Sequence, residues 1–376
     1  MPYASRAKCF VPLFLSLALL GGCSQLRVPG APGDPFVAYL PAERAGLADM
    51  REAFAAEFNR ALSAAGGEPD AARWLHNVAG APSPDTTPLV PAVPGASSAS
   101  VLIIPGIFGD CVANQSVPFG DGVSRQTPAN YTQAHGRYGP LGFASMRVAQ
   151  VSGRASTATN ARRIAQEIEL EARRPEISTI IVVAYSKGTP DTMEALELLR
   201  ARGALPSKLK AFLSVAGVVM GTLIADEFEA LHNALAARVT PLECSPSEGA
   251  EVTSLTHRER LLWLAAHPLP GGVKLFSVVA HTGPDRVAPG LKLFHAKLSE
   301  VDPRNDGQVI ASWAVLPGST LLAEAKSDHW RFVLPMDKHP NVLVRNLASR
   351  DEFPREQFFS ALLRTLMKSV APPARP

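Results

Sequence analysis

Residues 177–190 read ISTIIVVAYSKGTP, and this stretch decides the fold. Its first part, from Ile177 to Ala184, is a continuous apolar run rich in β-branched residues. Such a run is typical of a strand that is buried on both faces of a parallel sheet. A tight Ser-Lys-Gly turn follows, and a helix is predicted from Pro190 to Arg200. The segment therefore predicts a strand, a sharp turn and a helix in direct succession.

Strands and helices alternate on both sides of this segment. Further β-type runs are predicted at 101–104, 146–151, 209–216, 273–280 and 321–325. Helical segments are predicted at 159–172, 227–237, 258–265 and 355–367. This alternation predicts an α/β protein with a mainly parallel central sheet and helices on both faces.

The segment Ala184-Tyr185-Ser186-Lys187-Gly188 resembles the nucleophile elbow GxSxG of the α/β hydrolases, with alanine in place of the first glycine. Small residues are needed there because the turn is tight and holds the serine in a strained conformation. The strand before the turn and the helix after it supply context, since Ser-x-Gly alone also begins ordinary helices. The resemblance covers roughly residues 101–367. It implies an α/β-hydrolase fold, a nucleophilic Ser186, and a helical lid within residues 222–271.

A serine hydroxyl needs a base and a carboxylate that orients the base, which this fold supplies in the order Ser, Asp or Glu, His. His329 lies just past the last predicted strand, where the family's catalytic histidine belongs, and His339 is the second choice. Asp306 lies in Asn305-Asp306-Gly307-Gln308-Val309, which resembles the acid-bearing N/S-D-G-x-V segment of bacterial lipases. Asp302 is the alternative acid. Asp306 and His329 are 329 − 306 = 23 residues apart, which leaves room for one strand and two turns.

Other titratable residues near these positions receive structural interpretations. Asp328 adjoins the base, but the side chain of a sequence neighbour usually points elsewhere. The remaining histidines after Ser186 are expected to be solvated or structurally satisfied: His232, His257, His267, His281 and His295.

Acyl transfer also needs donors for the developing oxyanion. The resemblance implies that one is the backbone N–H of Lys187, directly after the nucleophile. The second is expected from the loop Pro105-Gly106-Ile107-Phe108-Gly109, and Ile107 is chosen over Phe108. This loop lacks the histidine of the family's H-G-x-x-G pattern.

The N-terminus is predicted to be a targeting segment. Arg6 and Lys8 precede an apolar run, Phe10 to Leu20, which suits a signal peptide and is too short to span a bilayer. The run ends at Gly21-Gly22-Cys23-Ser24 and resembles a bacterial lipobox, which implies a signal peptide over 1–22 and lipidation of Cys23. Serine after the cysteine implies an outer-membrane location in the cell envelope. The alternative is an ordinary secretory signal with an incidental cysteine.

Three further segments complete the predicted organisation. Residues 23–35 are a Pro- and Gly-rich tether, residues 36–100 a helical extension and linker, and residues 101–370 the hydrolase domain. Apolar residues at three- and four-residue steps support the helical extension: Leu47, Met50, Phe54, Phe58 and Leu62.

Composition excludes several classes. A content of 46% hydrophobic and 19% charged residues is typical of a globular protein. The net charge of +3 is spread along the chain without a basic cluster, so no nucleic-acid partner is expected.

After cleavage and lipidation, Cys111 and Cys244 are the remaining ordinary thiols, either paired in a disulfide or buried separately. No CxxC or HExxH spacing occurs, so neither metal nor cofactor is expected.

Together these features predict a membrane-anchored, esterase- or lipase-like serine hydrolase that acts on a small-molecule or lipid ester. The alternative is a cell-envelope binding lipoprotein that keeps the fold without turnover. A thioester, polyester or peptide substrate stays open, as does the oligomeric state.

Overall fold

The computed structural model describes residues 47–78, 89–107, 136–236, 250–336, 342–348 and 353–370. These residues form a seven-stranded sheet whose strands all pair in parallel, in the order β1-β7-β6-β5-β4-β2-β3. The strands are β1 (Ala48–Asp49), β2 (Ala99–Ile104), β3 (Ser145–Val148), β4 (Thr179–Tyr185), β5 (Leu209–Val215), β6 (Lys274–His281) and β7 (Thr320–Lys326). The predicted α/β architecture with a parallel central sheet is confirmed.

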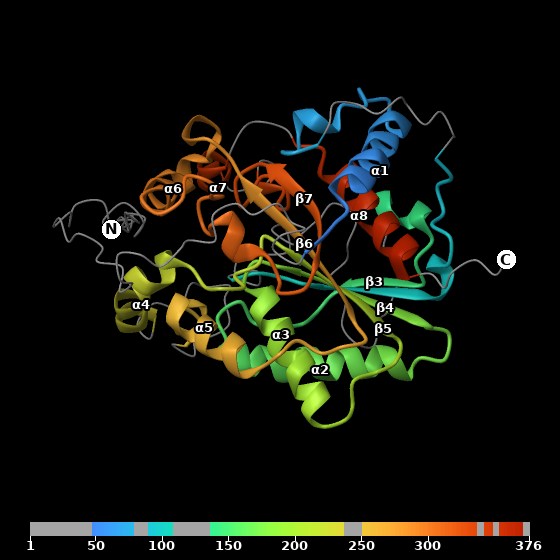
Figure 1. Ribbon diagram of the computed structural model, residues 1–376, viewed down its shortest axis with the longest axis horizontal. Helices are drawn as coiled ribbons and strands as arrows, with labels where there is room; N and C mark the ends of the chain where they lie inside the picture. The colour runs from blue at the N-terminus through green and yellow to red at the C-terminus, as the bar shows by residue number, and fades with distance from the viewer. Residues whose placement is uncertain are drawn as a thin grey trace, which may run out of the picture. The chain divides into compact units, whose positions relative to one another are not determined.

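Helices cover both faces of this sheet (Figure 1). On one face α2 (Thr157–Arg173) packs against α3 (Gly188–Ala201), and on the other α1 (Arg51–Ala64) packs against α8 (Arg355–Val370). The start of α2 follows from its sequence, because the Ser156 hydroxyl accepts a hydrogen bond from the Thr159 N–H and so caps the first turn. The sheet thus lies between two helical layers.

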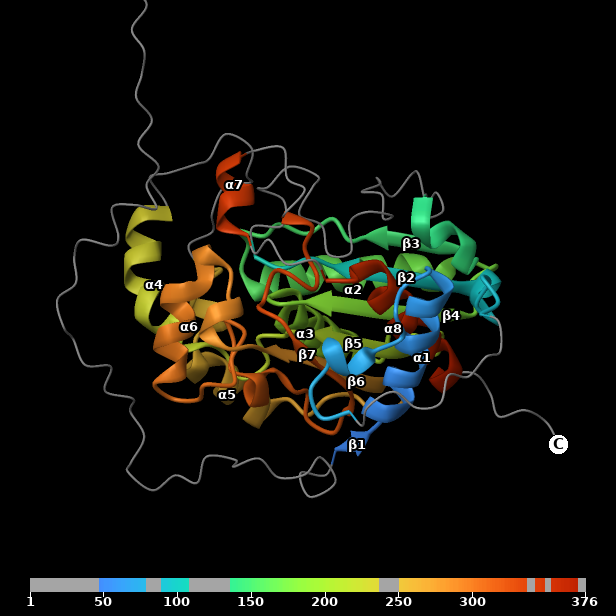
Figure 2. The ribbon, with the colours of Figure 1, turned by 90° about the horizontal axis from the view of Figure 1, so that it is seen from above.

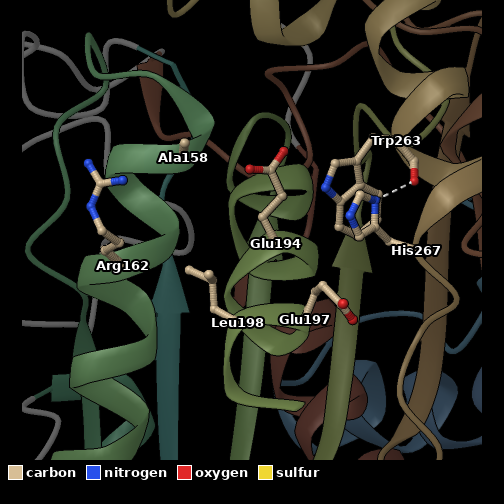
Figure 3. Close-up of a pocket in the computed structure, with 7 residues that line it drawn as sticks. All are labelled: Ala158, Arg162, Glu194, Glu197, Leu198, Trp263 and His267. Carbon is tan, nitrogen blue, oxygen red and sulfur yellow. Dashed lines mark hydrogen bonds between the residues drawn. The ribbon is translucent and has the colours of Figure 1, made fainter. Parts of the chain in front are cut away.

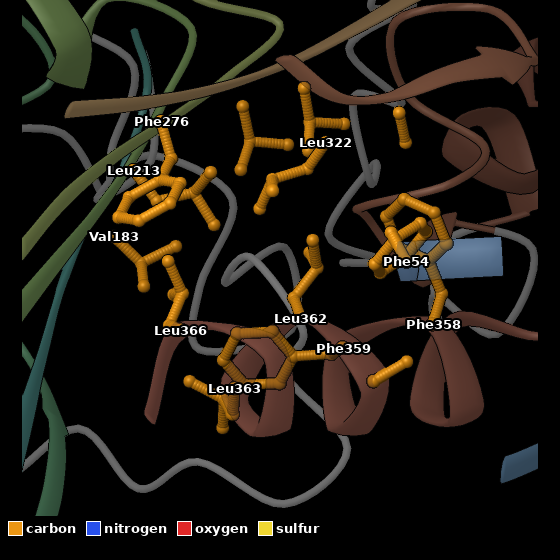
Figure 4. Packing of buried hydrophobic residues seen from close by; sticks show 14 of the residues in the cluster. Phe54, Val183, Leu213, Phe276, Leu322, Phe358, Phe359, Leu362, Leu363 and Leu366 are labelled. Atoms are coloured by element: carbon orange, nitrogen blue, oxygen red, sulfur yellow. The ribbon is translucent and has the colours of Figure 1, made fainter. Parts of the chain in front are cut away.

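Each face of the sheet has its own apolar core, and β4 contributes to both. Successive side chains of a strand point to opposite faces. Ile181 and Val183 join the core under α1 and α8, whereas Ile180 and Val182 join the core under α2 and α3. Figure 4 shows the α8 side, where the Phe358 ring meets other phenylalanine rings edge-on. Each fully buried large apolar side chain stabilises the fold by about 1.5–3 kcal/mol. Because β4 contributes such side chains to both cores, packing on both faces stabilises the strand that leads to Ser186.

Another group of helices lies at one end of the sheet in both ribbon views (Figures 1 and 2). They are α4 (Leu223–Ala236), α5 (His257–Ala266), α6 (Lys292–Ser299) and α7 (Val342–Leu347). Parallel strands all finish at the same edge of a sheet. Because α4 follows β5 and α6 follows β6, this is the edge at which the strands end.

The stretch of helical periodicity that includes Leu47 and Leu62 is not helical throughout. Ala48 and Asp49 form β1, which pairs with β7, and the helix begins only at Arg51. After the helix the chain returns to β7, where the Lys326 N–H donates to Trp74 O at 2.8 Å. The physical reason is long-range, because the unpaired edge of β7 offers donors and acceptors that this segment satisfies.

Smaller differences concern element ends and short helices. β3 stops at Val148 rather than at residue 151, and α6 was not predicted. Within the described ranges, none of the helices combines the length and the apolar character needed to cross a bilayer.

Candidate active site

The turn after β4 holds Ser186 in a left-handed backbone conformation, with φ of 54°. A non-glycine residue adopts such a conformation at an energetic cost, and it persists only where the surroundings impose it. Here the Ser186 N–H donates to Val215 O of the neighbouring strand, and Ser186 O accepts from the Thr189 N–H of α3. The elbow is therefore fixed from the sheet on one side and from the helix on the other.

Glycines make room for this turn. A Cβ on Gly188 would lie 2.7 Å from the backbone oxygens of both Ile104 and Pro105. A Cβ on Gly106 would lie 3.0 Å from the Cβ of Ser186. Alanine is tolerated at position 184, since Ala184 is the fully buried last-but-one residue of β4. The loop after β2 thus passes directly beside Ser186.

His329 and Asp306 complete a row of hydrogen bonds with Ser186. The Oγ of Ser186 lies 2.9 Å from His329 Nε2, and His329 Nδ1 lies 2.6 Å from Asp306 Oδ2. With the Nδ1 proton donated to the carboxylate, Nε2 is left to accept the hydroxyl proton of Ser186. The three side chains are buried. Such an arrangement can deprotonate the serine as it attacks a carbonyl carbon.

The second carboxylate oxygen of Asp306 is also bonded. Its Oδ1 accepts from the N–H groups of Gln308 and Val309, at 2.8 and 2.7 Å. In addition, the His329 N–H donates to the Asp306 carbonyl oxygen at 2.8 Å. These bonds fix the carboxylate so that Oδ2 faces the imidazole.

Neither alternative carboxylate bonds to His329. Asp302 pairs with Arg304, whose hydrogen bonds outweigh the effect of burial and lower the pKa of Asp302. The Asp328 carboxylate accepts from the N–H groups of Ala288 and Trp330 at 3.0 Å each, and it braces the loop around the base. Burial raises the pKa of Asp328.

The described alternative histidines take structural roles. His295 Nε2 lies 2.9 Å from Thr282 O, and His257 Nδ1 contacts Met220 O. His267 stacks on Trp263, and His281 stacks on His76 with ring centroids 3.8 Å apart. Ser186 is not a partner in any of these contacts.

The two predicted oxyanion donors, the N–H groups of Lys187 and Ile107, belong to segments that lie beside Ser186. Lys187 is the next residue, and Ile107 follows Gly106, where an added Cβ would lie 3.4 Å from Ser186 Oγ. Within the described residues, the N–H groups of Ile107 and Lys187 donate to no other protein group. Two free donors beside a nucleophile suit a developing negative charge.

Two features of the site were not predicted. The Tyr185 hydroxyl donates to the His329 carbonyl oxygen at 2.8 Å, and burial raises the pKa of Tyr185 well above its ordinary value, so the donor keeps its proton. The Lys187 side chain is buried against Asp191. The sequence did not indicate either contact, because Tyr185 ends an otherwise apolar strand and a lysine such as Lys187 is usually exposed.

A cavity of about 190 Å³ lies elsewhere, between α2, α3 and α5 (Figure 3). Its lining residues are Ala158, Arg162, Glu194, Glu197, Leu198, Trp263 and His267. Because none of the hydrogen-bonded trio lines it, this cavity is not assigned to the reacting group.

Several predicted positions lie outside the described residues: Cys23, Phe108, Cys111, Cys244 and His339. Their roles, including the Cys111–Cys244 pairing, stay predictions. Among the residues that the structure does describe, no three His, Cys, Asp or Glu side chains gather as metal ligands.

The structure is similar to the crystal structure of a metagenomic carboxyl esterase, with a TM-score of 0.73 and 29% sequence identity. The likeness covers 88% of this chain and 95% of that one. The fold is that of the α/β hydrolases.

Two lipase structures are less similar to this structure, with lower TM-scores. One from Bacillus licheniformis is 17% identical, with a TM-score of 0.45 over 62% of this chain and 86% of that one. Lipase 1 from Pelosinus fermentans is 11% identical, with a TM-score of 0.45 over 73% and 99%. No model of a protein family and no curated protein matches the sequence.

Proposed function

We propose that this protein is a serine hydrolase that cleaves carboxylic esters through a covalent acyl-enzyme. The observation that carries the proposal is the row of hydrogen bonds from Ser186 through His329 to Asp306, at 2.9 and 2.6 Å. The likeness to a carboxyl esterase supports an ester as the substrate.

In the proposed mechanism each residue of the site has a defined role. The Ser186 oxygen attacks the ester carbonyl carbon while His329 Nε2 takes its proton, and Asp306 stabilises the resulting imidazolium. The N–H groups of Lys187 and Ile107 bind the carbonyl oxygen as it becomes negative. His329 then returns the proton to the leaving alcohol. A water molecule, activated by the same imidazole, hydrolyses the acyl-enzyme and releases the acid.

The decisive experiment compares the native protein with Ser186→Ala on short p-nitrophenyl esters. We expect a loss on the order of a millionfold in kcat, as for other enzymes that lose a serine nucleophile. Ser178→Ala changes an exposed serine that lies directly before β4, at the end remote from Ser186; it is the matched control and should keep native activity. If Ser186→Ala hydrolysed these esters at the native rate, the proposal would fail.

Labelling with a fluorophosphonate tests the alternative of a binding lipoprotein without turnover. A hydrolytic Ser186 reacts covalently, and Ser186→Ala does not. Absence of labelling in the native protein would favour the binding lipoprotein. A panel of oxygen esters of increasing chain length, beside matched thioesters, would then define the acyl preference.

We also propose that Cys23 carries lipid and holds the enzyme on the outer membrane of a bacterial cell. The support is sequence alone: an apolar run followed by Gly21, Gly22 and Cys23. Several acyl chains on one residue bind far more firmly than a single chain, since each buried CH₂ contributes about 0.8 kcal/mol. Cys23→Ser should move the protein from the membrane fraction to the soluble fraction, and an unchanged distribution would refute the anchor.

Residues 222–271 are proposed to include a lid. The support is the position of α4 and α5, which lie at the edge where the strands end, the edge that bears Ser186. Shortening this segment should change the chain-length preference more than the rate on the shortest ester. An unchanged preference would argue against the lid.

A further inference from the structure

A buried ion pair begins one residue beyond the proposed nucleophile. Lys187 is 1% exposed, and its Nζ lies 2.8 Å from both carboxylate oxygens of Asp191, one turn further along α3. Asp191 is equally buried, and its Oδ2 accepts from Asn160 Nδ2 of α2 at 2.7 Å. The Asn160 amide is fixed in turn, because Nδ2 donates to Ser152 O and Oδ1 accepts from the Ser152 N–H. The lysine is therefore tied to both helices on this face of the sheet.

Stability alone does not explain charges at this place. Burial raises the pKa of Asp191, against the opposing effects of Lys187 and Asn160, so the carboxylate is held in an environment that disfavours its charge. Replacing a buried ion pair by apolar residues of similar volume is often neutral or stabilising. The apolar core around α3, which includes Met193 and Leu196, could accept such residues.

The location of the pair suggests what it does instead. The backbone N–H of Lys187 is one of the two free donors beside Ser186, and the clamped side chain restrains the backbone from which it extends. Asp191 lies in the first turn of α3. An unneutralised carboxylate there would occupy the positive end of the helix and repel an oxyanion. The ammonium group of Lys187 cancels that charge and leaves the helix end free.

We propose that Lys187 and Asp191 are positioning residues for acyl transfer: their ion pair fixes the Lys187 N–H where the oxyanion forms and removes a competing negative charge. This role rests on the proposed function. In this role the side chains of Lys187, Asp191 and Asn160 help the backbone to hold the Lys187 N–H in position.

The test compares Lys187→Met, Lys187→Arg and the double variant Lys187→Met/Asp191→Leu. Lys187→Met should lower kcat by about 10- to 100-fold, part of the loss that follows complete removal of an oxyanion donor. KM should change by less than about threefold, because substrate binding in the ground state is untouched. Lys187→Arg keeps the charge and should recover much of the rate.

A boronic acid gives a readout separate from turnover, because its tetrahedral adduct with Ser186 places an oxygen at the oxyanion position. Its affinity should fall in Lys187→Met by the same factor as kcat. The affinity for the product carboxylic acid should stay near native.

The double variant shows whether a low kcat in Lys187→Met comes from the lost positioning of the N–H or only from the unpaired charge left on Asp191. It contains neither charge, so its urea unfolding midpoint should be close to native even if Lys187→Met folds poorly. Its kcat should nevertheless stay low. Recovery of native kcat in the double variant, or a native kcat in Lys187→Met, would overturn the positioning role.

Arg147→Met is the matched control. Arg147 is also 1% exposed, and its Nε donates to Glu171 Oε1 at 2.8 Å on the edge strand β3. This variant should lower the unfolding midpoint and leave the kcat of the folded protein native. Failure of the proposed function would give a different result. Either the native protein would hydrolyse no ester, or Ser186→Ala would hydrolyse esters at the native rate, and the proposed function and the positioning role would then both be overturned.

Discussion

Gly188→Ala tests how closely the loop after β2 packs on the nucleophile turn. The added methyl group would lie 2.7 Å from Ile104 O and Pro105 O and 3.0 Å from Ile104 Cγ2. Ordinary contact begins at 3.4 Å, so each backbone oxygen must move by about 3.4 − 2.7 = 0.7 Å. These atoms belong to the strand end that leads to Ile107, and they cannot rotate away as a side-chain tip would.

Two effects of known size follow. Overpacking of this kind destabilises a fold by about 1–3 kcal/mol, and alanine in place of a helical glycine offsets about 0.5–1 kcal/mol. We therefore expect the free energy of unfolding to fall by about 1–2 kcal/mol. A displacement approaching 1 Å near reacting groups lowers the rate by about 100-fold, so kcat should fall more than the stability loss alone would suggest.

Urea unfolding followed by circular dichroism, together with p-nitrophenyl butyrate turnover, measures both effects. Gly283→Ala is the matched control, because nothing lies within 4 Å of its Cβ position and its φ of −75° lies outside the left-handed range. It should keep native kcat and gain up to about 1 kcal/mol. The reasoning is wrong if Gly188→Ala unfolds at the native midpoint and turns over at the native rate.

Two further predictions concern charge. Asp306→Asn should lower kcat on p-nitrophenyl esters by about four orders of magnitude. The amide oxygen would keep the bonds from the N–H groups of Gln308 and Val309, so the NH2 group would face His329 Nδ1 and impose the wrong tautomer on the imidazole. Asp302→Asn alters the pairing with Arg304 and should stay within about threefold of native; the reverse ranking would transfer the acid's role to Asp302. His76 has a pKa lowered to about 4 from its ordinary 6.5 by burial and by the adjacent His281. The unfolded chain therefore binds this proton first, and stability should fall as the pH drops from 6.5 towards 4. Urea midpoints across that range should fall less steeply in His76→Gln, and equal slopes would contradict this account.

The sequence was informative where structure depends on local pattern. The part of the run from Ile180 to Ala184 is buried on both faces, as its β-branched residues indicated, and Ser186 follows it at the turn. Asp306 and His329 were chosen by their order and spacing around one strand, and β7 does lie between them. The structure brings these two side chains within hydrogen-bond distance of one another, while their catalytic roles remain our proposal.

What the sequence did not indicate depends on partners far along the chain. Two residues, Ala48 and Asp49, carry no periodicity of their own, and β1 exists because β7 offers an edge. Lysine is rarely buried unless it is paired, so the burial of Lys187 depends on Asp191, whose carboxylate accepts a hydrogen bond from Asn160 of α2. The Tyr185 hydroxyl likewise finds its acceptor only once the loop after β7 is in place.

The binding of β1 to β7 and of α1 to α8 ties the two ends of the described chain together. Ser186 comes from the middle, but its base follows a strand whose outer edge is covered by the N-terminal segment. A fragment that stops before β7 keeps Ser186 but lacks His329, and a fragment that starts after α1 keeps both residues but leaves the outer edge of β7 without β1. Hydrolysis is therefore expected to require the whole stretch from β1 to the loop after β7, although Ser186 itself lies far from either end of that stretch.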